Sequence, residues 1–259
     1  MSLPTIKQHC QTLRLSALVE TLPHTLKLAQ EQNWPPEAFL LELLEQEVAR
    51  RRERRIERLL REAHLPFGKT LAQFEQNRLP LRLQRQIPEL VTGTFMDQAE
   101  NILIFGQPGT GKTHLIAALA REWVQRDYPV LFTPTFKLVD TLLRAKRDYE
   151  LEQQLKRLDR FRMIILDDFG YIQQSREEME VLFTFLAERY ERRSVAITSN
   201  LVFSQWDQIF KDPLTTAAAV DRVVHHSRII EFGAEMTSVR AETAAHRQQQ
   251  LADVPAING

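Results

Sequence analysis

Five short apolar runs alternate with longer amphipathic segments between residues 101 and 232. The runs read NILIF (101–105), PVLFT (129–133), RMIIL (162–166), SVAITS (194–199) and RIIEF (228–232). Such runs are typical of parallel strands that helices cover on both faces. The segments between them predict helices that begin near Gly111, Thr135, Glu150, Arg176 and Pro213. This alternation predicts an α/β fold in which a parallel sheet is flanked by helices.

The first 65 residues or so follow the helical period instead. Apolar residues recur at spacings of three and four, at Leu40, Leu43, Leu44, Val48, Ile56, Leu59 and Leu60. Pro35 and Pro36 open this helix at a point where a missing backbone donor costs little. An earlier helical stretch carries Ile6, Cys10, Leu13, Ala17 and Leu18. We therefore expect a small all-helical N-terminal domain over residues 1–66.

Residues 64–80, HLPFGKTLAQFEQNRLP, hold prolines and a glycine between two periodic segments. Such a composition predicts the link to a second domain, which we place at residues 67–245. The last residues, 246–259, are polar and without periodicity, as is typical of a disordered tail.

The composition is that of an ordinary soluble protein, with 43% hydrophobic and 26% charged residues in a chain of 259. No apolar run approaches the roughly 20 residues that span a membrane, and the first 30 residues lack the pattern of a signal peptide. We therefore expect a cytoplasmic protein without a membrane partner. The single cysteine, Cys10, excludes an internal disulfide framework and a cysteine cluster for zinc.

The net charge is zero, but seven arginines crowd into twelve positions, at Arg50, Arg51, Arg52, Arg54, Arg55, Arg58 and Arg61. Two interpretations stay open. Glu53, Glu57 and Glu62 lie three or four positions from arginines, so the segment can be a salt-bridged helical face. Clustered arginines can equally contact the phosphate backbone of nucleic acid and release its counterions.

The most informative motif follows the first apolar run. Gly106, Gly111, Lys112 and Thr113 satisfy the phosphate-loop pattern G-x-x-x-x-G-K-[ST], with a predicted strand before it and a helix after it. Backbone N–H groups of such a loop surround phosphate. Lys112 would reach the β- and γ-phosphates, and the Thr113 hydroxyl would bind Mg²⁺. We expect the nucleotide to be bound by Gly106, Gln107, Pro108, Gly109, Thr110, Gly111, Lys112, Thr113 and His114.

Polar residues end two later strands. Asp167 and Asp168 follow MIIL at the carboxyl end of the sheet, where ligands bind in open α/β folds. Asp167 is then placed to hold Mg²⁺, and Asp168 to accept a proton from the attacking water. Asn200 ends the run SVAITS and can hydrogen-bond both the water and the γ-phosphate.

The order of these motifs resembles that of the AAA+ ATPases. More narrowly, the chain resembles the IstB helper ATPases of bacterial insertion sequences and their relatives, the DnaC helicase loaders. The matching segments are KTLAQFE (69–75), GQPGTGKTHLIAALA (106–120), DDFGYI (167–172), LAERYERRSVAITSN (186–200), SQWDQIF (204–210) and AAAVDRVVHHSRII (217–230). They span most of residues 69–240.

The resemblance implies ATP and Mg²⁺ as ligands and assigns Lys112 and Thr113 to phosphate and metal, Asp167 to the metal, Asp168 to water activation and Asn200 to the sensor position. Arg222 matches the arginine that such families insert into a neighbouring subunit's site, with Arg228 as the alternative. Arg240 matches the second sensor, which touches the γ-phosphate of its own subunit. His114, Trp206, His225 and His226 match as family features, and we interpret them as packing or surface residues.

Two positions depart from the family pattern. Many relatives carry Glu where this chain has the shorter Asp168, and the segment SVRAE around Arg240 replaces the usual Ser-Tyr-Arg-Leu-Arg.

The resemblance implies an ATP-dependent helper of transposition. It would assemble as a homo-oligomer on duplex DNA with little sequence preference, help to choose or deform the insertion site, and recruit the transposase. A helicase loader is the first alternative, because its ATPase core would look nearly the same. A nucleotide switch or a small-molecule kinase is the second, although the sequence carries no acceptor motif.

Overall fold

The computed structural model describes residues 3–170, 175–202, 205–206 and 213–233. The chain divides into two compact units, Met1–Arg58 and Leu59–Gly259. The division falls within the long helix α3 (Pro36–Glu62). The predicted domain limits at residues 66 and 245 stay predictions, and the second of them lies outside the described residues.

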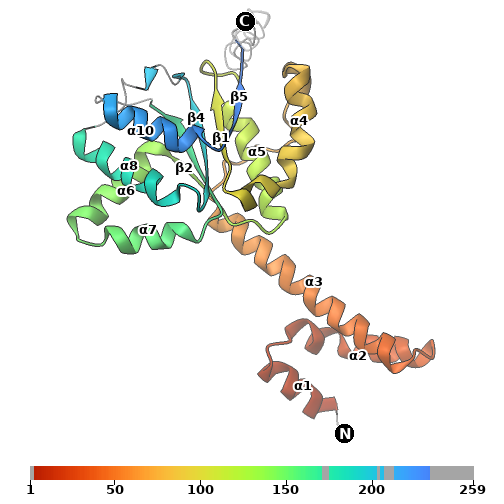
Figure 1. Ribbon diagram of the computed structural model, residues 1–259. Helices are drawn as coiled ribbons and strands as arrows, with labels where there is room; N and C mark the ends of the chain where they lie inside the picture. Colours follow the sequence, from red (N-terminus) through yellow and green to blue (C-terminus); the bar gives the residue numbers. More distant parts are fainter. Residues whose placement is uncertain (1–2, 171–174, 203–204, 207–212, 234–259) are drawn as a thin grey trace, which may run out of the picture. The chain divides into compact units, whose positions relative to one another are not determined.

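The first unit contains helices α1 (Leu3–Thr12) and α2 (Ser16–Glu31) and most of α3 (Figure 1). Its small core consists of Cys10, Leu18, Leu22 and Leu43. The single helical stretch predicted from Ile6 to Leu18 is wrong, because the chain turns at Arg14, where φ is 57°. The turn allows residues on both sides of it to reach the same core.

A buried carboxylate holds α2 against α3 in this unit. The side chain of Glu47 accepts hydrogen bonds from the backbone N–H groups of Ala17 (2.8 Å) and Leu18 (3.2 Å) at the start of α2, and from Arg51 (2.8 Å). Burial alone would raise the pKa of Glu47, but the Arg51 guanidinium and the two N–H donors outweigh it and lower the pKa. Arg51 also donates to Arg14 O, and Arg54 donates to Ser16 Oγ. Part of the arginine cluster therefore holds the helical unit together.

The second unit is an α/β domain with strands β1 (Asn101–Phe105), β2 (Val130–Pro134), β3 (Met163–Phe169), β4 (Ser194–Ser199) and β5 (Ser227–Glu231). Its helices are α4 (Leu81–Thr92), α5 (Lys112–Gln125), α6 (Thr135–Arg147), α7 (Leu151–Asp159), α8 (Arg176–Arg189) and α10 (Pro213–Val224), with short 3-10 turns at η1 (Gln76–Arg78) and η2 (Thr94–Gln98). The strand order is β2-β3-β4-β1-β5 and all pairs are parallel. The predicted fold class is confirmed.

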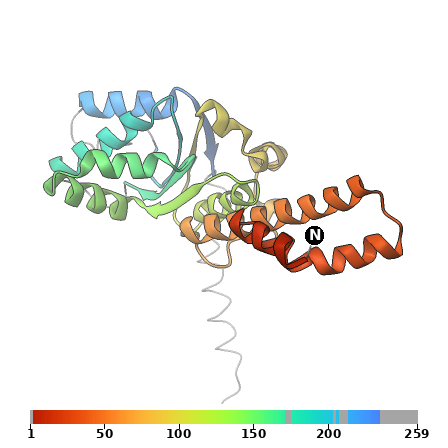
Figure 2. The same cartoon turned by 90° about the horizontal axis from the view of Figure 1, so that it is seen from below.

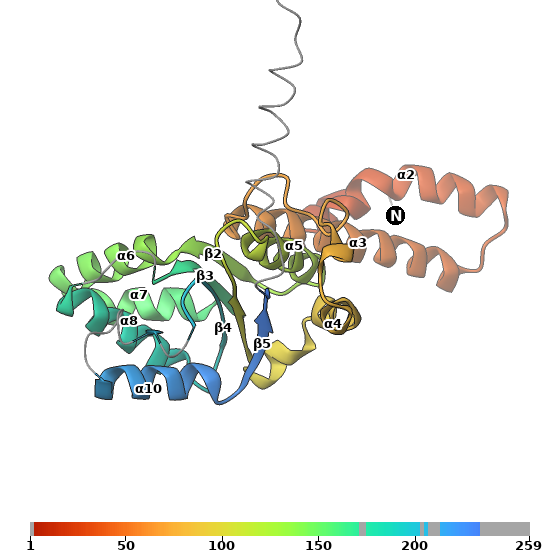
Figure 3. The same ribbon diagram turned by 90° about the horizontal axis from the view of Figure 1, so that it is seen from above.

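Helices cover both faces of this sheet. Views from below and above show α6, α8 and α10 on one side and α5 with α4 on the other (Figures 2 and 3). On the first side, apolar residues of these three helices pack with alternate strand residues such as Leu103 and Phe105. On the other, α5 buries almost every apolar residue, and the Trp123 indole donates to Leu90 O of α4. No helix in the described part of the chain is long and apolar enough to cross a membrane.

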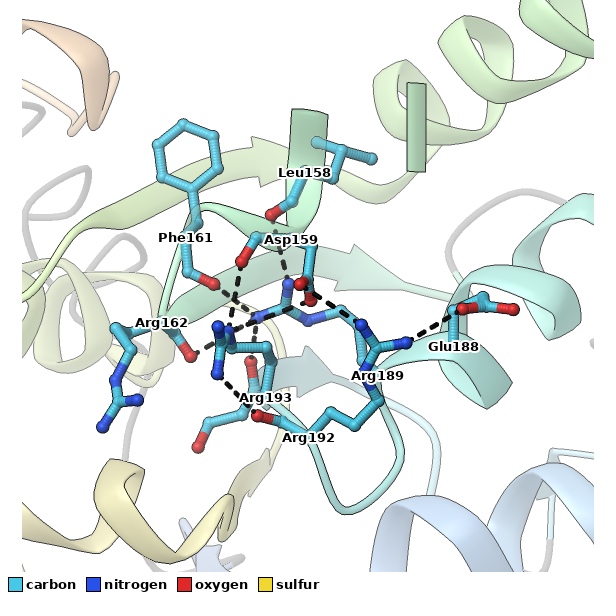
Figure 4. Close-up of polar contacts among 9 residues, drawn as sticks. Leu158, Asp159, Phe161, Arg162, Glu188, Arg189, Arg192 and Arg193 are labelled. Atoms are coloured by element: carbon cyan, nitrogen blue, oxygen red, sulfur yellow. Dashed lines mark hydrogen bonds and ion pairs between the residues drawn. The ribbon is translucent and has the colours of Figure 1, made fainter. Parts of the chain in front are cut away.

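A buried arginine fastens the amino ends of the strands (Figure 4). Arg189, 3% exposed, donates to the backbone carbonyls of Leu158, Phe161, Arg162 and Ser194, at 2.8 to 3.3 Å. These acceptors belong to the end of α7 and to the starts of β3 and β4. Burial lowers the pKa of Arg189 to about 9, although the charge of Asp159 opposes this shift. The group therefore keeps its proton at neutral pH and donates to four carbonyls, of which Leu158 O and Arg162 O also accept backbone N–H groups.

We predict that Arg189→Met lowers the free energy of unfolding by about 3 kcal/mol or more, because four hydrogen bonds from a charged group are lost and each contributes about 1.5–3 kcal/mol. Arg192→Met is the matched control. Its side chain lies at the surface with Glu188 and Asp159, and exposed ion pairs contribute about 0–1 kcal/mol. Urea unfolding of both variants measures the difference, and equal losses would show that Arg189 is no more important than a surface residue.

Candidate nucleotide-binding site

The strand order gathers three predicted segments at one edge of the sheet. β4 lies between β3 and β1, and Ser199 pairs with both Phe169 and Phe105. Asp167 and Asp168 at the end of β3, Asn200 after β4, and the loop 106–111 after β1 therefore follow neighbouring strands. This is the carboxyl edge, where open α/β sheets bind ligands. Asn200 is exposed there.

The phosphate loop has a backbone that its glycines make possible. Gly106, Gly109 and Gly111 have φ values of 154°, 85° and 103°, which side chains other than glycine's rarely allow. A Cβ on Gly106 would lie 2.6 Å from Phe232 Cβ. Lys112 is nearly buried, and its ammonium donates to Gly106 O (2.7 Å) and Gln107 O (2.9 Å). The lysine charge is thus already held inside the loop. Gln107 and Pro108 form its exposed tip, and Thr110 Oγ1 donates to Gln107 O.

A buried carboxylate joins this loop to the sheet. Asp167, 7% exposed, accepts hydrogen bonds on Oδ1 from Thr113 Oγ1 (3.0 Å) and Thr198 Oγ1. Thr113 begins α5, whereas Thr198 belongs to β4, so the contacts connect three elements. Burial raises the pKa of Asp167, and the charge of Asp168 adds to the rise, although the two hydroxyls and Lys112 lower it in part. A buried carboxylate between hydroxyl groups fits a Mg²⁺ ligand, because this cation prefers oxygen donors.

Asp168 faces solvent because the strand bulges at this point. The pairing of β3 with β4 shifts between Leu166 and Phe169, where three residue steps oppose two on β4. Asp168 has a φ of 56°, and its N–H donates to Thr198 Oγ1 (3.1 Å). Bulges re-aim side chains beside active sites, and aspartate tolerates this backbone conformation better than most residues. One carboxylate is therefore buried and its neighbour is exposed.

The segment interpreted as a link from the sequence contributes to the site. Thr70 O lies 3.1 Å from His114 Nε2, and the Phe74 ring meets the His114 ring edge to face with centroids 5.2 Å apart. Phe74 would also contact a Cβ placed on Gly111. Burial lowers the pKa of His114 and the charge of Lys69 adds to this, although Thr70 O opposes it. His114 thus contacts both the linker and the start of α5, and its predicted part in nucleotide binding stays a prediction.

Thr198 is the site residue that sequence reasoning missed. It contacts both Asp167 and the backbone of Asp168. The only signal in the sequence is its position two residues before Asn200 on the strand next to β3, and strand order cannot be read from the chain.

The two candidate trans arginines have different surroundings. Arg222 lies on α10, where its guanidinium stacks 4.6 Å from the centroid of the Phe183 ring of α8 and donates to Ala218 O. Arg228 on β5 donates to Glu100 (2.7 Å) and Glu89 (2.6 Å), and although burial opposes it, these carboxylates raise the pKa of Arg228. Arg228 is therefore held by two carboxylates, whereas Arg222 contacts an aromatic ring and a backbone carbonyl. Arg240 lies outside the described residues.

Comparison with known proteins gives a consistent result. The family described as IstB-like ATP binding protein matches residues 8–246. An insertion sequence ATP-binding protein of Sinorhizobium fredii is 41% identical over 92% of this chain and 80% of its own length. The insertion sequence IS21 ATP-binding protein of Pseudomonas aeruginosa is 37% identical over 89% of this chain and 86% of its own.

Solved structures support the fold. The DnaC helicase loader superposes with a TM-score of 0.55 at 16% identity and covers 64% of this chain and 98% of its own. DnaA from Aquifex aeolicus superposes with a TM-score of 0.53 at 19% identity over 73% of this chain and 57% of its own.

We predict that Asp167→Asn weakens binding of Mg²⁺ with nucleotide but stabilises the ligand-free protein. Because the folded pKa of Asp167 is raised, the ionised carboxylate lowers stability at neutral pH, and this penalty disappears as the pH falls through the folded pKa. Asparagine keeps an acceptor for both threonines without the charge. The expected rise in Tm is about 2–4 °C for each kcal/mol gained.

Asp168→Asn is the control for this experiment, because that side chain is exposed and asparagine suits its positive φ. Calorimetric scans at pH 7 of the three proteins without nucleotide make the comparison. A lower Tm for Asp167→Asn than for Asp168→Asn would contradict the buried-charge explanation.

Gly106→Ala should abolish nucleotide binding, because the new Cβ would overlap Phe232 at the base of the loop. Gly233→Ala is the matched control, since a Cβ at that neighbouring position meets nothing within 4 Å. Titration with a fluorescent ATP analogue measures both. Normal binding by Gly106→Ala would show that the loop can move without harm.

Proposed function

The chain belongs to the family of IstB-like ATP binding proteins, and from this premise we propose how it works as an ATPase helper of insertion sequences. Binding of ATP drives its assembly on duplex DNA, and the assembly recruits the transposase. Hydrolysis then controls the lifetime of that assembly. The relatives named for insertion sequences favour this role over helicase loading, for which the likeness to DnaC supports only the fold.

The observation that carries the proposal is the separation within the fold between Arg222 and the phosphate loop of the same chain. Arg222 lies in the last turn of α10, which ends just before the start of β5. The amino ends of the strands are there, whereas the loop follows the carboxyl end of β1. An arginine at the end of the sheet opposite to its own phosphate loop is better placed to contact a nucleotide bound by a neighbouring subunit.

The residues at the carboxyl edge divide the work of hydrolysis. The loop N–H groups and Lys112 bind the phosphates, and Thr113 and Asp167 would hold Mg²⁺, which would neutralise phosphate charge. Asp168 accepts a proton from the water that attacks the γ-phosphorus while the bond to ADP breaks. Asn200 orients that water. The exposure of Asp168 supports its role as the base, because water reaches it directly.

Sharing the site between subunits couples ATP to assembly. A ligand that binds only the assembled state stabilises that state by mass action. Arg222 of a neighbour would stabilise charge on the leaving γ-phosphoryl group, and in related chemistry such an arginine contributes about 10³ to 10⁵ in rate. ATP bound by an isolated subunit would therefore be hydrolysed slowly.

Arg222→Ala and Asp168→Asn should each be nearly inactive ATPases, yet partly recover activity when mixed. A mixed assembly contains interfaces that pair an intact Asp168 with an intact Arg222 of the other variant. Phosphate release from each variant and from the mixture tests the shared site. Each variant mixed with itself at the same total concentration is the control.

Arg228 provides the competing outcome. Because Arg228 bridges Glu89 and Glu100, Arg228→Ala should lower stability and leave the ATPase rate per folded molecule largely unchanged. If instead Arg228→Ala recovers with Asp168→Asn and Arg222→Ala does not, the trans arginine is Arg228. If neither pair recovers, the site is not shared.

For DNA binding we infer that the arginines of α3 divide into structural and contacting members. Arg51 and Arg54 hold the helical unit together, whereas Arg52 and Arg58 are exposed and form no ion pair among the described residues. Exposed arginines on one helix can contact successive phosphates.

Replacing Arg52 and Arg58 together by alanine should weaken duplex binding in the presence of ATP and reduce the slope of log K against log salt by roughly 0.9 for each phosphate that the protein no longer neutralises. Replacing Lys27 and Lys156, which are paired with Glu31 and Glu152, removes the same charge elsewhere. Fluorescence anisotropy between about 50 and 200 mM salt compares them. Equal salt slopes for the two double variants would show that Arg52 and Arg58 belong to a solvated helical face and do not contact DNA.

A further inference from the structure

Three metal-ligating side chains meet at the amino ends of the strands, away from the phosphate loop. Glu191 lies in the turn after α8, and His225 and His226 lie in the turn between α10 and β5. One ligand atom of each lies within 4.8 Å of the other two. The ATPase mechanism uses none of them. The sequence interpretation as surface residues accounts for the exposure of the histidines but not for their meeting with Glu191.

The surroundings fix the backbone of this cluster. The N–H of Asn101 donates to His226 O (2.7 Å), and its side chain donates to Val223 O and accepts from Val195 N. Asn101 is buried at the start of β1. The turn that carries the histidines is thereby tied to the start of β4, only a few residues after Glu191.

The side chains themselves remain adjustable. His226 Nε2 lies 3.9 Å from Glu191 Oε1, and the two side chains are 50% and 58% exposed. Ligands of a tetrahedral site lie roughly 3.3 Å from one another when metal–nitrogen bonds are about 2.0–2.1 Å long. Exposed side chains change rotamer within nanoseconds, so a small rotation is enough to bring the three ligand atoms to this spacing.

One histidine already has the second contact that metal ligands use. His225 Nδ1 lies 2.9 Å from the Tyr190 hydroxyl, and coordination of a metal ion through Nε2 would keep this contact. Ligating histidines nearly always bond through the other ring nitrogen, and this contact fixes the ring orientation. Tyr190 directly precedes Glu191, so the same turn supplies one ligand and the support for another.

We propose that Glu191, His225 and His226 form a binding site for a divalent transition-metal ion of the Zn²⁺ type, with water as a further ligand. Two imidazoles and one carboxylate suit such an ion, whereas Mg²⁺ and Ca²⁺ prefer oxygen ligands alone. The ion joins the turn before β4 to the end of α10. It therefore braces the helix that carries Arg222. Only this last consequence rests on the proposed function, and metal binding itself does not.

The test uses the full chain without added histidines, after treatment with a chelator. Titration with Co²⁺ should saturate at one equivalent, with the visible absorption of a four-coordinate site, and Zn²⁺ should displace it. The ion should also raise Tm. His226→Ala and Glu191→Gln should lose the absorption and the rise in Tm, while His24→Ala, which removes an exposed histidine from α2, should keep both.

Tyr190→Phe separates a built site from chance proximity. Removing the hydroxyl that supports His225 should weaken Co²⁺ binding about 10- to 100-fold, as is typical when such supporting contacts are removed. Circular dichroism checks that each variant is folded. The proposal is overturned if the protein binds no Co²⁺. It is also overturned if the protein binds more than one equivalent of Co²⁺ and His226→Ala and His24→Ala bind it equally. Neither result depends on ATPase activity, so failure here leaves the proposed function untouched.

Discussion

The site depends on one buried carboxylate. Asp167 occupies a position where burial opposes its charge, and two threonine hydroxyls from different elements hold it there. Thr113 connects it to the phosphate loop and Thr198 to the central strand. The phosphate loop, the acidic end of β3 and the polar end of β4 are therefore not three independent motifs. They share one hydrogen-bonded centre whose charge favours a cation, and the bulge at the same point exposes the neighbouring Asp168.

The sequence predicted the fold because its signals were local and agreed with one another. Each apolar run forms a strand, and the glycine-rich loop lies between β1 and α5 as the motif requires. Periodicity also indicated the helical front end. It failed at Arg14, because a single residue with positive φ interrupts the helix without changing the apolar spacing. A pattern of spacings records which residues are buried and cannot show that the chain turns back between them.

The parts of the site that the sequence did not predict are long-range pairings. Thr198 and Asp167 are 31 positions apart, and Thr70 and His114 are 44 positions apart. The linker therefore looked like a simple connection, and Thr198 looked like an ordinary strand residue. The roles of Arg51 and Arg54 were hidden for the same reason. Their charge suggested either salt bridges within one helix or nucleic acid. Arg51 does pair with Glu47 within the helix, but it also reaches Arg14 O before α2, and Arg54 reaches Ser16 Oγ at the start of α2. Composition reveals charge, whereas only the fold assigns it a partner.

The two ends of the sheet have different tasks, and α10 connects them. At the carboxyl edge the groups that we propose to bind and cleave ATP are gathered around Asp167. At the amino edge Arg189 fastens the starts of β3 and β4, and Asn101 connects β4 to Val223 at the end of α10, the residue directly after Arg222. The end of α10 that carries Arg222 is therefore hydrogen-bonded to the sheet, which suits an arginine that we propose to enter a neighbouring subunit's site. A trans arginine has to be held in this way, because the assembly can only sense ATP if the guanidinium reaches the neighbouring site at a fixed position. Under the proposed function, the hydrogen bonds at the amino edge therefore contribute to hydrolysis together with the phosphate loop at the carboxyl edge.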